Sequence, residues 1–313
     1  MDMADGPIFS PRRALGRTGF AATALGVGDL ADRTVPIEAC VATARRALDA
    51  GLNVIDTAPN YEDGYSEEVV GRAVRGVRDR VFVIDKVDDL DAPVGPQVDA
   101  SLGRLGLDYA DAFVFHNLSS MAVFDRLCQS GGGFDQLADA VRAGKARFRG
   151  ISSHDPDVMT AALAAGVCDV VLFPVGPFVD DRYVTDVLPL AGRLGVGTVC
   201  FKAFGAGKLL GDTAGYNQPL KVRPRGKVSS GGTDGGDAVL PRLTVAECLH
   251  YTLTLDPDVA LLGLSYPNEQ DAAFAAARSF RPLTDEQMAD VRRRAVEARA
   301  GKGPCWWNPD PEA

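Results

Sequence analysis

Asn53-Val54-Ile55-Asp56-Thr57-Ala58-Pro59-Asn60-Tyr61 is a short apolar strand followed directly by a polar loop. Asp56 ends the strand, and Tyr61 comes five residues later. Two later apolar runs have the same form, because residues 81–84 lead to Lys86 and residues 112–115 lead to His116. Short, continuous runs rich in Val, Ile and Phe are typical of strands that are covered on both faces.

Such strands alternate with helical segments along the whole chain. Residues 37–48 carry apolar side chains at helical spacing. Thr244 with Glu247, and Thr284 with Gln287, predict capping boxes at the starts of two later helices. The eight predicted strands lie at residues 24–27, 53–55, 81–84, 112–115, 148–151, 170–173, 198–201 and 259–262.

Eight strands, each followed by a helix, predict an α/β fold in the form of a closed (β/α)8 TIM barrel. A doubly wound open sheet is the alternative, but no Gly-x-Gly-x-x-Gly follows the first strand. We therefore expect residues 1–313 to form a single barrel domain. Two pieces lie outside the repeat: a Gly-, Pro- and basic-rich insert at 211–241, predicted to be mobile, and a tail at 301–313.

The composition narrows the class of protein. The chain is 46% hydrophobic and 24% charged, with a net charge of -9, which argues against a nucleic-acid or anionic-membrane surface. No apolar stretch approaches the roughly 18 residues of a membrane span, and the polar N-terminus lacks a secretion signal. We expect a cytoplasmic protein. Because none of the six cysteines lies in a Cys-x-x-Cys pair, we expect no metal site.

Four polar side chains are predicted to meet at one mouth of the barrel. Asp56, Lys86 and His116 follow strands directly, and Tyr61 lies on the adjacent loop. A neighbouring ammonium should lower the pKa of a phenol and help it to protonate a carbonyl oxygen. Asp56 would hold Lys86, and His116 would orient the substrate. Because no side chain can donate a hydride, a nicotinamide cofactor is implied.

Several motifs of the chain together resemble those of the aldo-keto reductase family. The resemblance implies the TIM barrel, an N-terminal hairpin, carbonyl reduction with NADPH or the reverse oxidation, and Asp56, Tyr61, Lys86 and His116 as the catalytic residues. The motifs are residues 15–20, 25–28, 56–61, 64–71, 102–111, 144–147 and 150–152.

The same resemblance implies where the cofactor binds. Phe201 should stack on the nicotinamide, and the loop that it opens should cover the pyrophosphate, where glycines let the backbone approach phosphate. The expected cofactor-binding residues are Gly28, Asp29, Ser152, Ser153, Phe201, Lys202, Phe204, Gly205, Gly207, Lys208, Gly263, Ser265 and Glu269.

Several positions differ from the family pattern. Ser153 replaces an Asn and Leu172 replaces a Gln that commonly hold the carboxamide, a role that His154 or the backbone could take over. Ala272 and Ala273 replace a common acidic-amide pair. Glu269 stands about where a basic residue commonly contacts the 2′-phosphate, and a carboxylate repels phosphate. That change favours NAD(H), or an atypical NADP site that uses Lys208 or the basic residues of the insert, Lys221, Arg223, Arg225 and Lys227. Family habit leaves NADP(H) slightly favoured over NAD(H).

The substrate is expected to be a small-molecule carbonyl or alcohol. Its pocket should be formed by Tyr61 and His116, with Trp306 and Trp307 from the tail. Two other functions remain open. One is an NAD-linked sugar or secondary-alcohol dehydrogenase on the same fold, and the other is a cofactor-binding regulatory barrel with little catalysis.

Overall fold

The computed structural model describes residues 7–210, 241–300, 302, 305, 307 and 308. Nearly all of the predicted insert at 211–241 and most of the tail at 301–313, including Trp306, lie outside the described residues.

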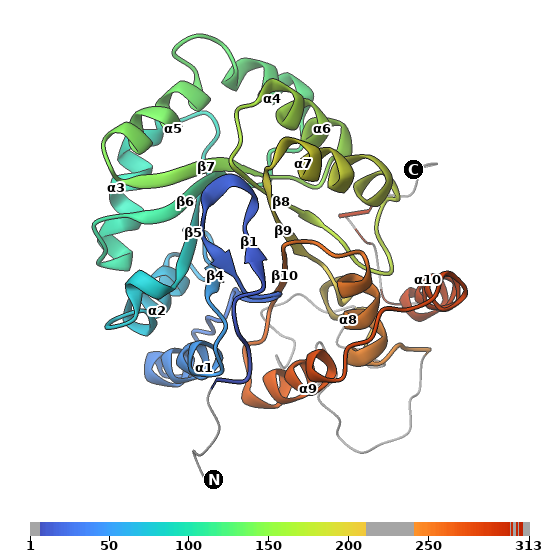
Figure 1. Cartoon of the computed structure of the whole chain (residues 1–313). Coiled ribbons are helices and arrows are strands. Elements are labelled where there is room, and N and C mark those ends of the chain that lie inside the picture. The colour runs from blue at the N-terminus through green and yellow to red at the C-terminus, as the bar shows by residue number, and fades with distance from the viewer. Residues whose placement is uncertain (1–6, 211–240, 301, 303–304, 306, 309–313) are drawn as a thin grey trace.

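The core of the fold is a closed barrel of eight parallel strands, in the order β10-β3-β4-β5-β6-β7-β8-β9 (Figure 1). Each of the eight predicted strands overlaps one strand of the barrel, so the predicted TIM barrel is confirmed. The strands are β3 (Leu25–Gly28), β4 (Val54–Asp56), β5 (Phe82–Val87), β6 (Ala110–Phe115), β7 (Ala146–Ser152), β8 (Val170–Pro174), β9 (Gly197–Phe201) and β10 (Val259–Leu262).

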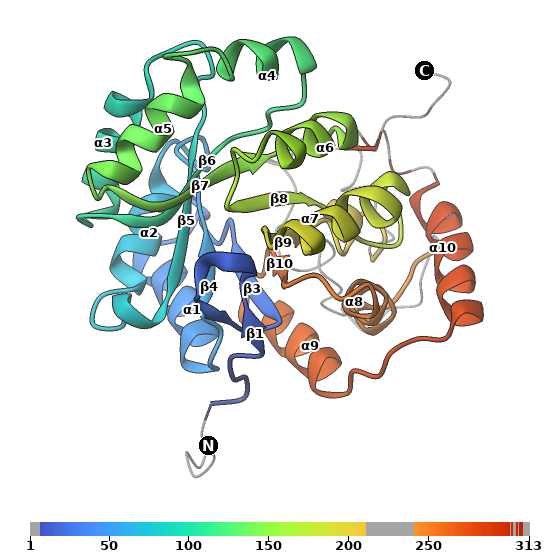
Figure 2. The same cartoon turned by 45° about the horizontal axis from the view of Figure 1, so that its top comes forward.

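Helices surround the barrel, as Figure 2 shows from a second direction. Their apolar faces pack on the outward side of the strands, where the larger of two buried apolar clusters lies. The helices are α1 (Ile37–Asp49), α2 (Tyr65–Ala73), α3 (Val94–Leu105), α4 (Met121–Leu127), α5 (Gly133–Arg142), α6 (Pro156–Ala165), α7 (Leu188–Leu194), α8 (Val245–Thr254), α9 (Pro267–Arg278) and α10 (Asp285–Arg299).

Local sequence signals set several helix starts. Both predicted capping boxes form, Thr244 with Glu247 at α8 and Thr284 with Gln287 at α10. Pro189 lies near the start of α7, and a π-helical turn at Tyr183–Val187 runs directly into this helix, because Val187 and Leu188 both have helical backbone angles. Since proline has no N–H to donate, one helical hydrogen bond is missing at this junction.

A two-stranded hairpin, β1 (Arg13–Ala14) and β2 (Ala21–Ala22), lies across the N-terminal end of the barrel in Figure 1. Leu15 between the two strands is buried with the residues of the barrel interior. The Arg17 amide donates to the Gly195 carbonyl at 2.7 Å, which joins the hairpin to the turn before β9. The predicted N-terminal hairpin therefore closes the barrel end away from the candidate site.

Strand alternation sorts side chains between the inside and the outside of the barrel. Val54, Phe82, Ile84, Ala112 and Val114 belong to the smaller apolar cluster, which fills the interior. Because side chains alternate along a strand, the next inward positions are 56, 86 and 116. The interior is thus apolar at its base and polar where the strands end.

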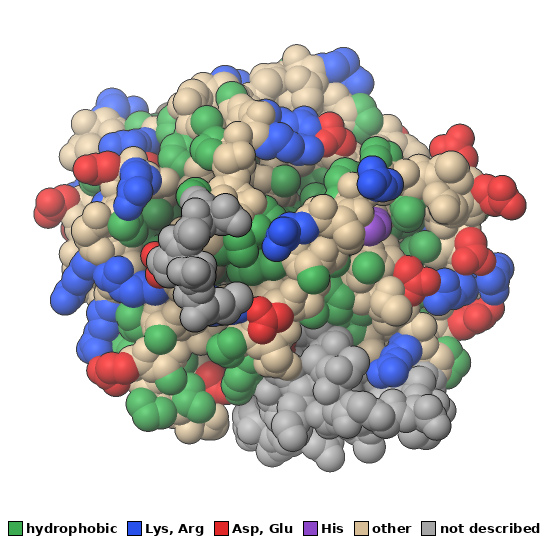
Figure 3. Space-filling view, turned by 60° about the horizontal axis from the view of Figure 1, so that its bottom comes forward, with side chains coloured by type: hydrophobic (Ala, Val, Ile, Leu, Met, Phe, Trp, Pro, Cys, Tyr) green, Lys and Arg blue, Asp and Glu red, His purple; other side chains and the backbone are tan. Residues whose placement is uncertain are grey.

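The surface mixes both signs of charge. Figure 3 shows acidic and basic side chains interspersed with apolar and uncharged ones on the face that it presents. None of the helices in the described ranges combines the length and the apolar composition that a membrane span requires.

One buried acid lies outside the barrel interior, beside α2 and α3. Asp85 on β5 is fully buried and accepts the Lys86 backbone N–H at 2.8 Å, while its other oxygen has no hydrogen-bond partner among the described residues. The nearby Glu67 is also fully buried and pairs with Arg104. Burial, and then the Glu67 carboxylate, raise the pKa of Asp85 well above 3.8. At a pH between the pKa of Asp85 in the unfolded chain and its higher pKa in the folded protein, the folded protein therefore keeps a proton that the unfolded chain releases.

We expect Asp85→Asn to remove a pH-dependent loss of stability. An amide keeps the acceptor for the Lys86 N–H and cannot ionise. Above pH 3.8 the wild-type native state holds more protons than the unfolded state. As the pH rises, the free energy of unfolding of the wild-type protein should therefore fall relative to that of the variant, by up to about 1.4 kcal/mol per pH unit. Urea unfolding of both proteins from about pH 4 to about pH 8 measures the difference.

Asp125→Asn on the exposed face of α4 is the charge-matched control and should leave the pH dependence unchanged. Parallel stability curves for wild type and Asp85→Asn would contradict a protonated Asp85.

Candidate active site

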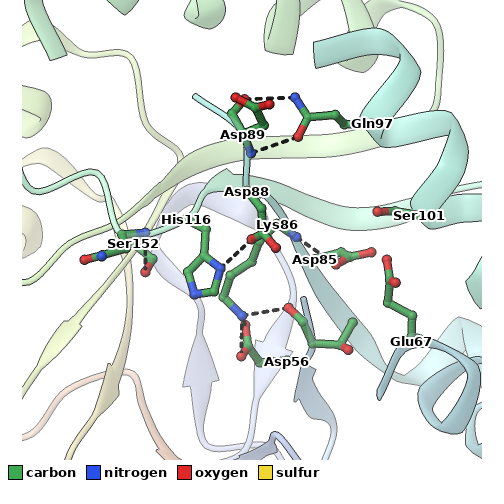
Figure 4. Close-up of polar contacts among 12 residues, drawn as sticks. Asp56, Glu67, Asp85, Lys86, Asp88, Asp89, Gln97, Ser101, His116 and Ser152 are labelled. Carbon is green, nitrogen blue, oxygen red and sulfur yellow. Dashed lines mark hydrogen bonds and ion pairs between the residues drawn. The ribbon is translucent and has the colours of Figure 1, made fainter. Parts of the chain in front are cut away.

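A buried ion pair lies at the C-terminal mouth of the barrel (Figure 4). The Lys86 ammonium lies 2.7 Å from each carboxylate oxygen of Asp56, and it donates to the Thr57 carbonyl at 2.6 Å. The exposed fractions of the Lys86 and Asp56 side chains are only 2% and 3%. Three oxygen acceptors therefore hold the ammonium in one place.

Burial acts on both members of the pair. It raises the pKa of Asp56, which Lys86 lowers by less. Burial alone would lower the pKa of Lys86, but Asp56 and Tyr61 raise it above its ordinary value. Because both carboxylate oxygens lie within hydrogen-bond distance of the ammonium, we describe the pair as ionised.

Tyr61 lies beside this ammonium, on the loop after β4. Lys86 Nζ is 4.5 Å from the centre of the Tyr61 ring. Burial raises the pKa of Tyr61 above 10, and Lys86 lowers it by less. Lys86 thus lowers the pKa of the phenol, as predicted, but burial outweighs this effect and the net shift of the pKa is upward. The phenol stays protonated at neutral pH, which is the form that can donate a proton.

His116 completes the group of four. Its ring meets the Tyr61 ring edge to face, with the ring centres 5.5 Å apart. His116 Nδ1 lies 2.5 Å from Asp88 Oδ1. The structure thus brings together the four predicted catalytic residues and adds Asp88 to them. Strand alternation could have placed Asp88 at the mouth, because it lies two residues beyond Lys86 and just after β5, but its pairing with His116 depends on the register between β5 and β6.

Gly28 and Gly263 provide space next to the ion pair. Gly28 pairs in register with Asp56, and a Cβ on Gly28 would lie 3.2 Å from Asp56 Oδ2. A Cβ on Gly263 would lie 3.7 Å from the Gly28 carbonyl oxygen. The Ser265 hydroxyl donates to the Asp29 carbonyl at 3.1 Å, so it joins the loops that follow β10 and β3.

The two serines after β7 are buried. Ser152 accepts the Asn117 N–H at 3.4 Å. Ser153 accepts the Asp155 N–H at 3.0 Å and lies 3.4 Å from the Ser119 hydroxyl. The Ser153 hydroxyl is thus used to shape its own turn, which leads into α6.

His154 lies near the aromatic ring expected to stack on the cofactor. The ring centres of His154 and Phe201 are 5.1 Å apart, and His154 Nδ1 lies 3.0 Å from the Asn117 amide oxygen. Burial, and then Lys202 and His116, lower the pKa of His154 to about 3, so its imidazole is neutral. Asp155 caps α6, so His154 does not.

Lys202 follows Phe201 at the end of β9. Its ammonium lies 5.7 Å from the centre of the Phe201 ring and 5.2 Å from that of Trp307, whose side chain is buried. Burial lowers the pKa of Lys202 to about 8, which Asp29 opposes. Phe201, Lys202 and Trp307 therefore form one contact group, while Trp306 lies outside the described residues.

The loop after Lys202 has a left-handed backbone. Gly205 and Gly207 have φ values of 54° and 84°, which glycine adopts without strain. Phe204, just before them, is buried. Lys208 donates through its ammonium to the Lys302 carbonyl, and Lys302 returns a bond of 2.8 Å to the Lys208 carbonyl. In this structure the Lys208 ammonium is therefore bonded to the tail.

Glu269 lies in the first turn of α9. It accepts the Tyr266 N–H at 3.3 Å and is 2% exposed. The Tyr266 hydroxyl donates to Asp32 at 2.8 Å. The start of α9 therefore carries the buried carboxylate of Glu269, and contacts that of Asp32, where the resemblance to the family would place a basic residue. Leu172, the other departure, is buried in the barrel interior.

No cluster of three His, Cys, Asp or Glu side chains suited to a metal ion occurs in the described part of the chain. The site instead offers one ion pair, one phenol, two imidazoles and an aromatic ring next to a lysine. Such a set can transfer a proton at an oxygen atom and can bind a flat, charged ligand.

Curated relatives share this sequence in part. L-galactose dehydrogenase of Arabidopsis thaliana is 30% identical over 63% of this chain and 66% of its own length. Methylglyoxal reductase YeaE of Escherichia coli is 35% identical over 37% of this chain and 39% of its own length. An NADH-specific methylglyoxal reductase of Escherichia coli is 27% identical over 66% of this chain and 68% of its own length. The chain thus spans less than two thirds of the first two relatives.

Solved structures share the fold along nearly the whole chain. An aldo-keto reductase from Bacillus halodurans in its holo form has a TM-score of 0.67 at 22% identity, with 91% of this chain and 96% of that one covered. An aldo-keto reductase from Klebsiella pneumoniae in complex with NADPH has a TM-score of 0.66 at 23% identity, with 93% of this chain and 96% of that one covered.

The sequence model of the Aldo/keto reductase family matches residues 23–295, which include the four residues at the barrel mouth. The chain therefore belongs to the aldo/keto reductase family.

Proposed function

We propose that the chain, acting as a single barrel domain, is an NAD(P)H-dependent oxidoreductase that reduces an aldehyde or a ketone to an alcohol. The observation that carries the proposal is the buried Lys86–Asp56 ion pair beside the protonated phenol of Tyr61. A buried pair of charges is costly to keep, and here it supports a group that can donate a proton.

In the proposed reaction Tyr61 donates its hydroxyl proton to the carbonyl oxygen of the substrate. The phenolate left behind is stabilised by the Lys86 ammonium, which Asp56 and the Thr57 carbonyl hold in place. His116, edge to face with Tyr61, is placed to contact the same oxygen. In the reverse direction the same residues take the proton from an alcohol.

A bound nicotinamide cofactor supplies the hydride for reduction and accepts it in oxidation. The residues at the mouth suit such a ligand. Phe201 offers a half-buried ring, Lys202 a positive charge, and Gly205 and Gly207 a backbone without side chains. Trp307 contacts the same lysine and is the described tail residue proposed for the substrate pocket.

Tyr61→Phe should nearly abolish turnover. The variant keeps the ring beside Lys86 but has no proton to donate, so kcat should fall by about 100- to 10,000-fold. Cofactor affinity should stay within about twofold, because the phenol is not among the proposed cofactor ligands. Steady-state assays on a panel of aldehydes and ketones, with fluorescence titration of the cofactor, measure both.

Tyr65→Phe is the matched control, because Tyr65 on α2 bonds the Val35 carbonyl away from the ion pair. It should retain near wild-type turnover. Unchanged kcat in Tyr61→Phe would remove the proton donor from the mechanism. Cofactor binding without turnover of any carbonyl would favour the regulatory barrel.

For the cofactor we propose NADP(H) ahead of NAD(H), supported by the Klebsiella pneumoniae structures solved with NADPH and with NADP. Two observations count for NAD(H): the buried Glu269 at the start of α9, and the NADH-specific relative. Glu269→Gln tests whether the charge of Glu269 sets the cofactor preference, because the amide oxygen can still cap the helix while the charge is lost.

Glu269→Gln should raise the affinity for NADPH by about tenfold and leave that for NADH unchanged, since only NADPH carries the 2′-phosphate that the carboxylate repels. Fluorescence titrations with both cofactors measure the change. Glu247→Gln, which alters the equivalent capping residue of α8, should change neither affinity. Equal gains for both cofactors would place Glu269 away from the 2′-phosphate.

A second function, an NAD-linked sugar or secondary-alcohol dehydrogenase, is favoured by the similarity to L-galactose dehydrogenase. Assays in both directions at one pH, with sugars and simple secondary alcohols as substrates, distinguish it from the carbonyl reductase.

A further inference from the structure

The contact between Asp88 and His116 follows from the register of two neighbouring strands. β5 and β6 pair Lys86 with Val114 and Val87 with Phe115. The next pair in that register is Asp88 with His116, and the His116 N–H donates to the Val87 carbonyl at 2.9 Å. The two side chains face the same side and meet at 2.5 Å between Asp88 Oδ1 and His116 Nδ1.

This contact decides which ring nitrogen of His116 carries a proton. A carboxylate can only accept a hydrogen bond, so Nδ1 must be the donor. A neutral imidazole has one N–H, and its other nitrogen then carries a lone pair. Figure 4 shows the second ring nitrogen of His116 pointing away from Asp88. That nitrogen, Nε2, is the one left for the substrate.

We propose that Asp88 is a positioning residue, which holds neutral His116 as its Nδ1–H tautomer and so presents Nε2 to the substrate as a hydrogen-bond acceptor. A neutral His116 then accepts a bond from an alcohol or a neighbouring hydroxyl group of the substrate. It can donate to a carbonyl oxygen only after a second proton makes it an imidazolium. The inference rests on the proposed function, in which His116 contacts the substrate oxygen.

Several titratable groups surround His116, and their charges matter for this assignment. They are Asp56 on β4, Tyr61 on the next loop, Lys86 on β5, Asp88 just after β5, His154 after β7 and, beyond it, Lys202. The pKa values of Tyr61 and Lys86 are raised, and that of His154 is lowered to about 3. Tyr61, Lys86 and His154 therefore do not change their protonation state in the neutral pH range, where a histidine ordinarily titrates.

The tautomer can be measured directly, because the chain has three histidines. Two-bond proton–nitrogen spectra of protein labelled with ¹⁵N-histidine distinguish a protonated ring nitrogen from an unprotonated one. His154 and His250 variants identify the signals. At a pH where His116 is neutral, we expect a protonated Nδ1 and an unprotonated Nε2. A protonated Nε2 in the wild-type protein would overturn the proposal.

Asp88→Ala tests the cause. Without the carboxylate, a large share of neutral His116 should shift to the Nε2–H tautomer. Asp89→Asn is the control, because Asp89 is the next carboxylate along the chain and its side chain bonds the amides of Asp91 and Ala92 in its own loop. It should leave the tautomer as in wild type. An unchanged tautomer in Asp88→Ala would also overturn the proposal.

The kinetic consequence is a change of pH profile. With saturating cofactor, wild-type kcat/KM for carbonyl reduction should fall by about tenfold per pH unit above the titration of His116 seen in the same spectra. In Asp88→Ala this fall should be lost, because the Nε2–H tautomer can donate while neutral. The same fall in both proteins would refute the link to catalysis. The spectra need no turnover, so a failure of the proposed function is recognised separately, by an active Tyr61→Phe variant.

Discussion

The buried contact between the Lys86 ammonium and the Asp56 carboxylate is the interaction around which the barrel mouth is organised. Removing either partner would leave an uncompensated buried charge, a change that commonly costs about 3–5 kcal/mol. Surrounding features fit the same constraint. Gly28 has no side chain to displace Asp56, and the Thr57 carbonyl gives the ammonium a third acceptor. Because the ammonium is fixed, the Tyr61 ring beside it has a defined electrostatic environment.

Strand β5 shows how alternation places charges in different surroundings. Lys86 points into the barrel toward Asp56, whereas Asp85, its neighbour, points out toward Glu67 and keeps a proton (Figure 4). Asp88, two positions beyond Lys86, turns inward again and meets His116. β5 and the residue just after it thus contribute the lysine of the ion pair, a neutral acid in the outer layer and the partner of the histidine.

The side of the mouth that we propose for the cofactor differs more from the family pattern. Ser153 and Glu269 use their polar atoms to shape or cap the segments that contain them, and Lys208 bonds the tail. Polar groups engaged in this way have less capacity for a ligand, because each hydrogen bond within the fold must be replaced if it is broken. Phe201, Lys202, Trp307 and the neutral His154 are gathered at this position, and they suit a flat aromatic ligand.

The sequence by itself determined the eight strands, the capping boxes and the four residues that meet at the mouth, because apolar runs and strand alternation are local properties that need no partner. Only the tertiary structure decided the pairing of Asp88 with His116, the raised pKa of Tyr61 and the bond from Lys208 to the tail. The first depends on the register between two strands, the second on how deeply the phenol is buried, and the third on a contact between residues 94 positions apart. Register, burial and long-range contacts arise only when separate segments pack together, so no local pattern encodes them.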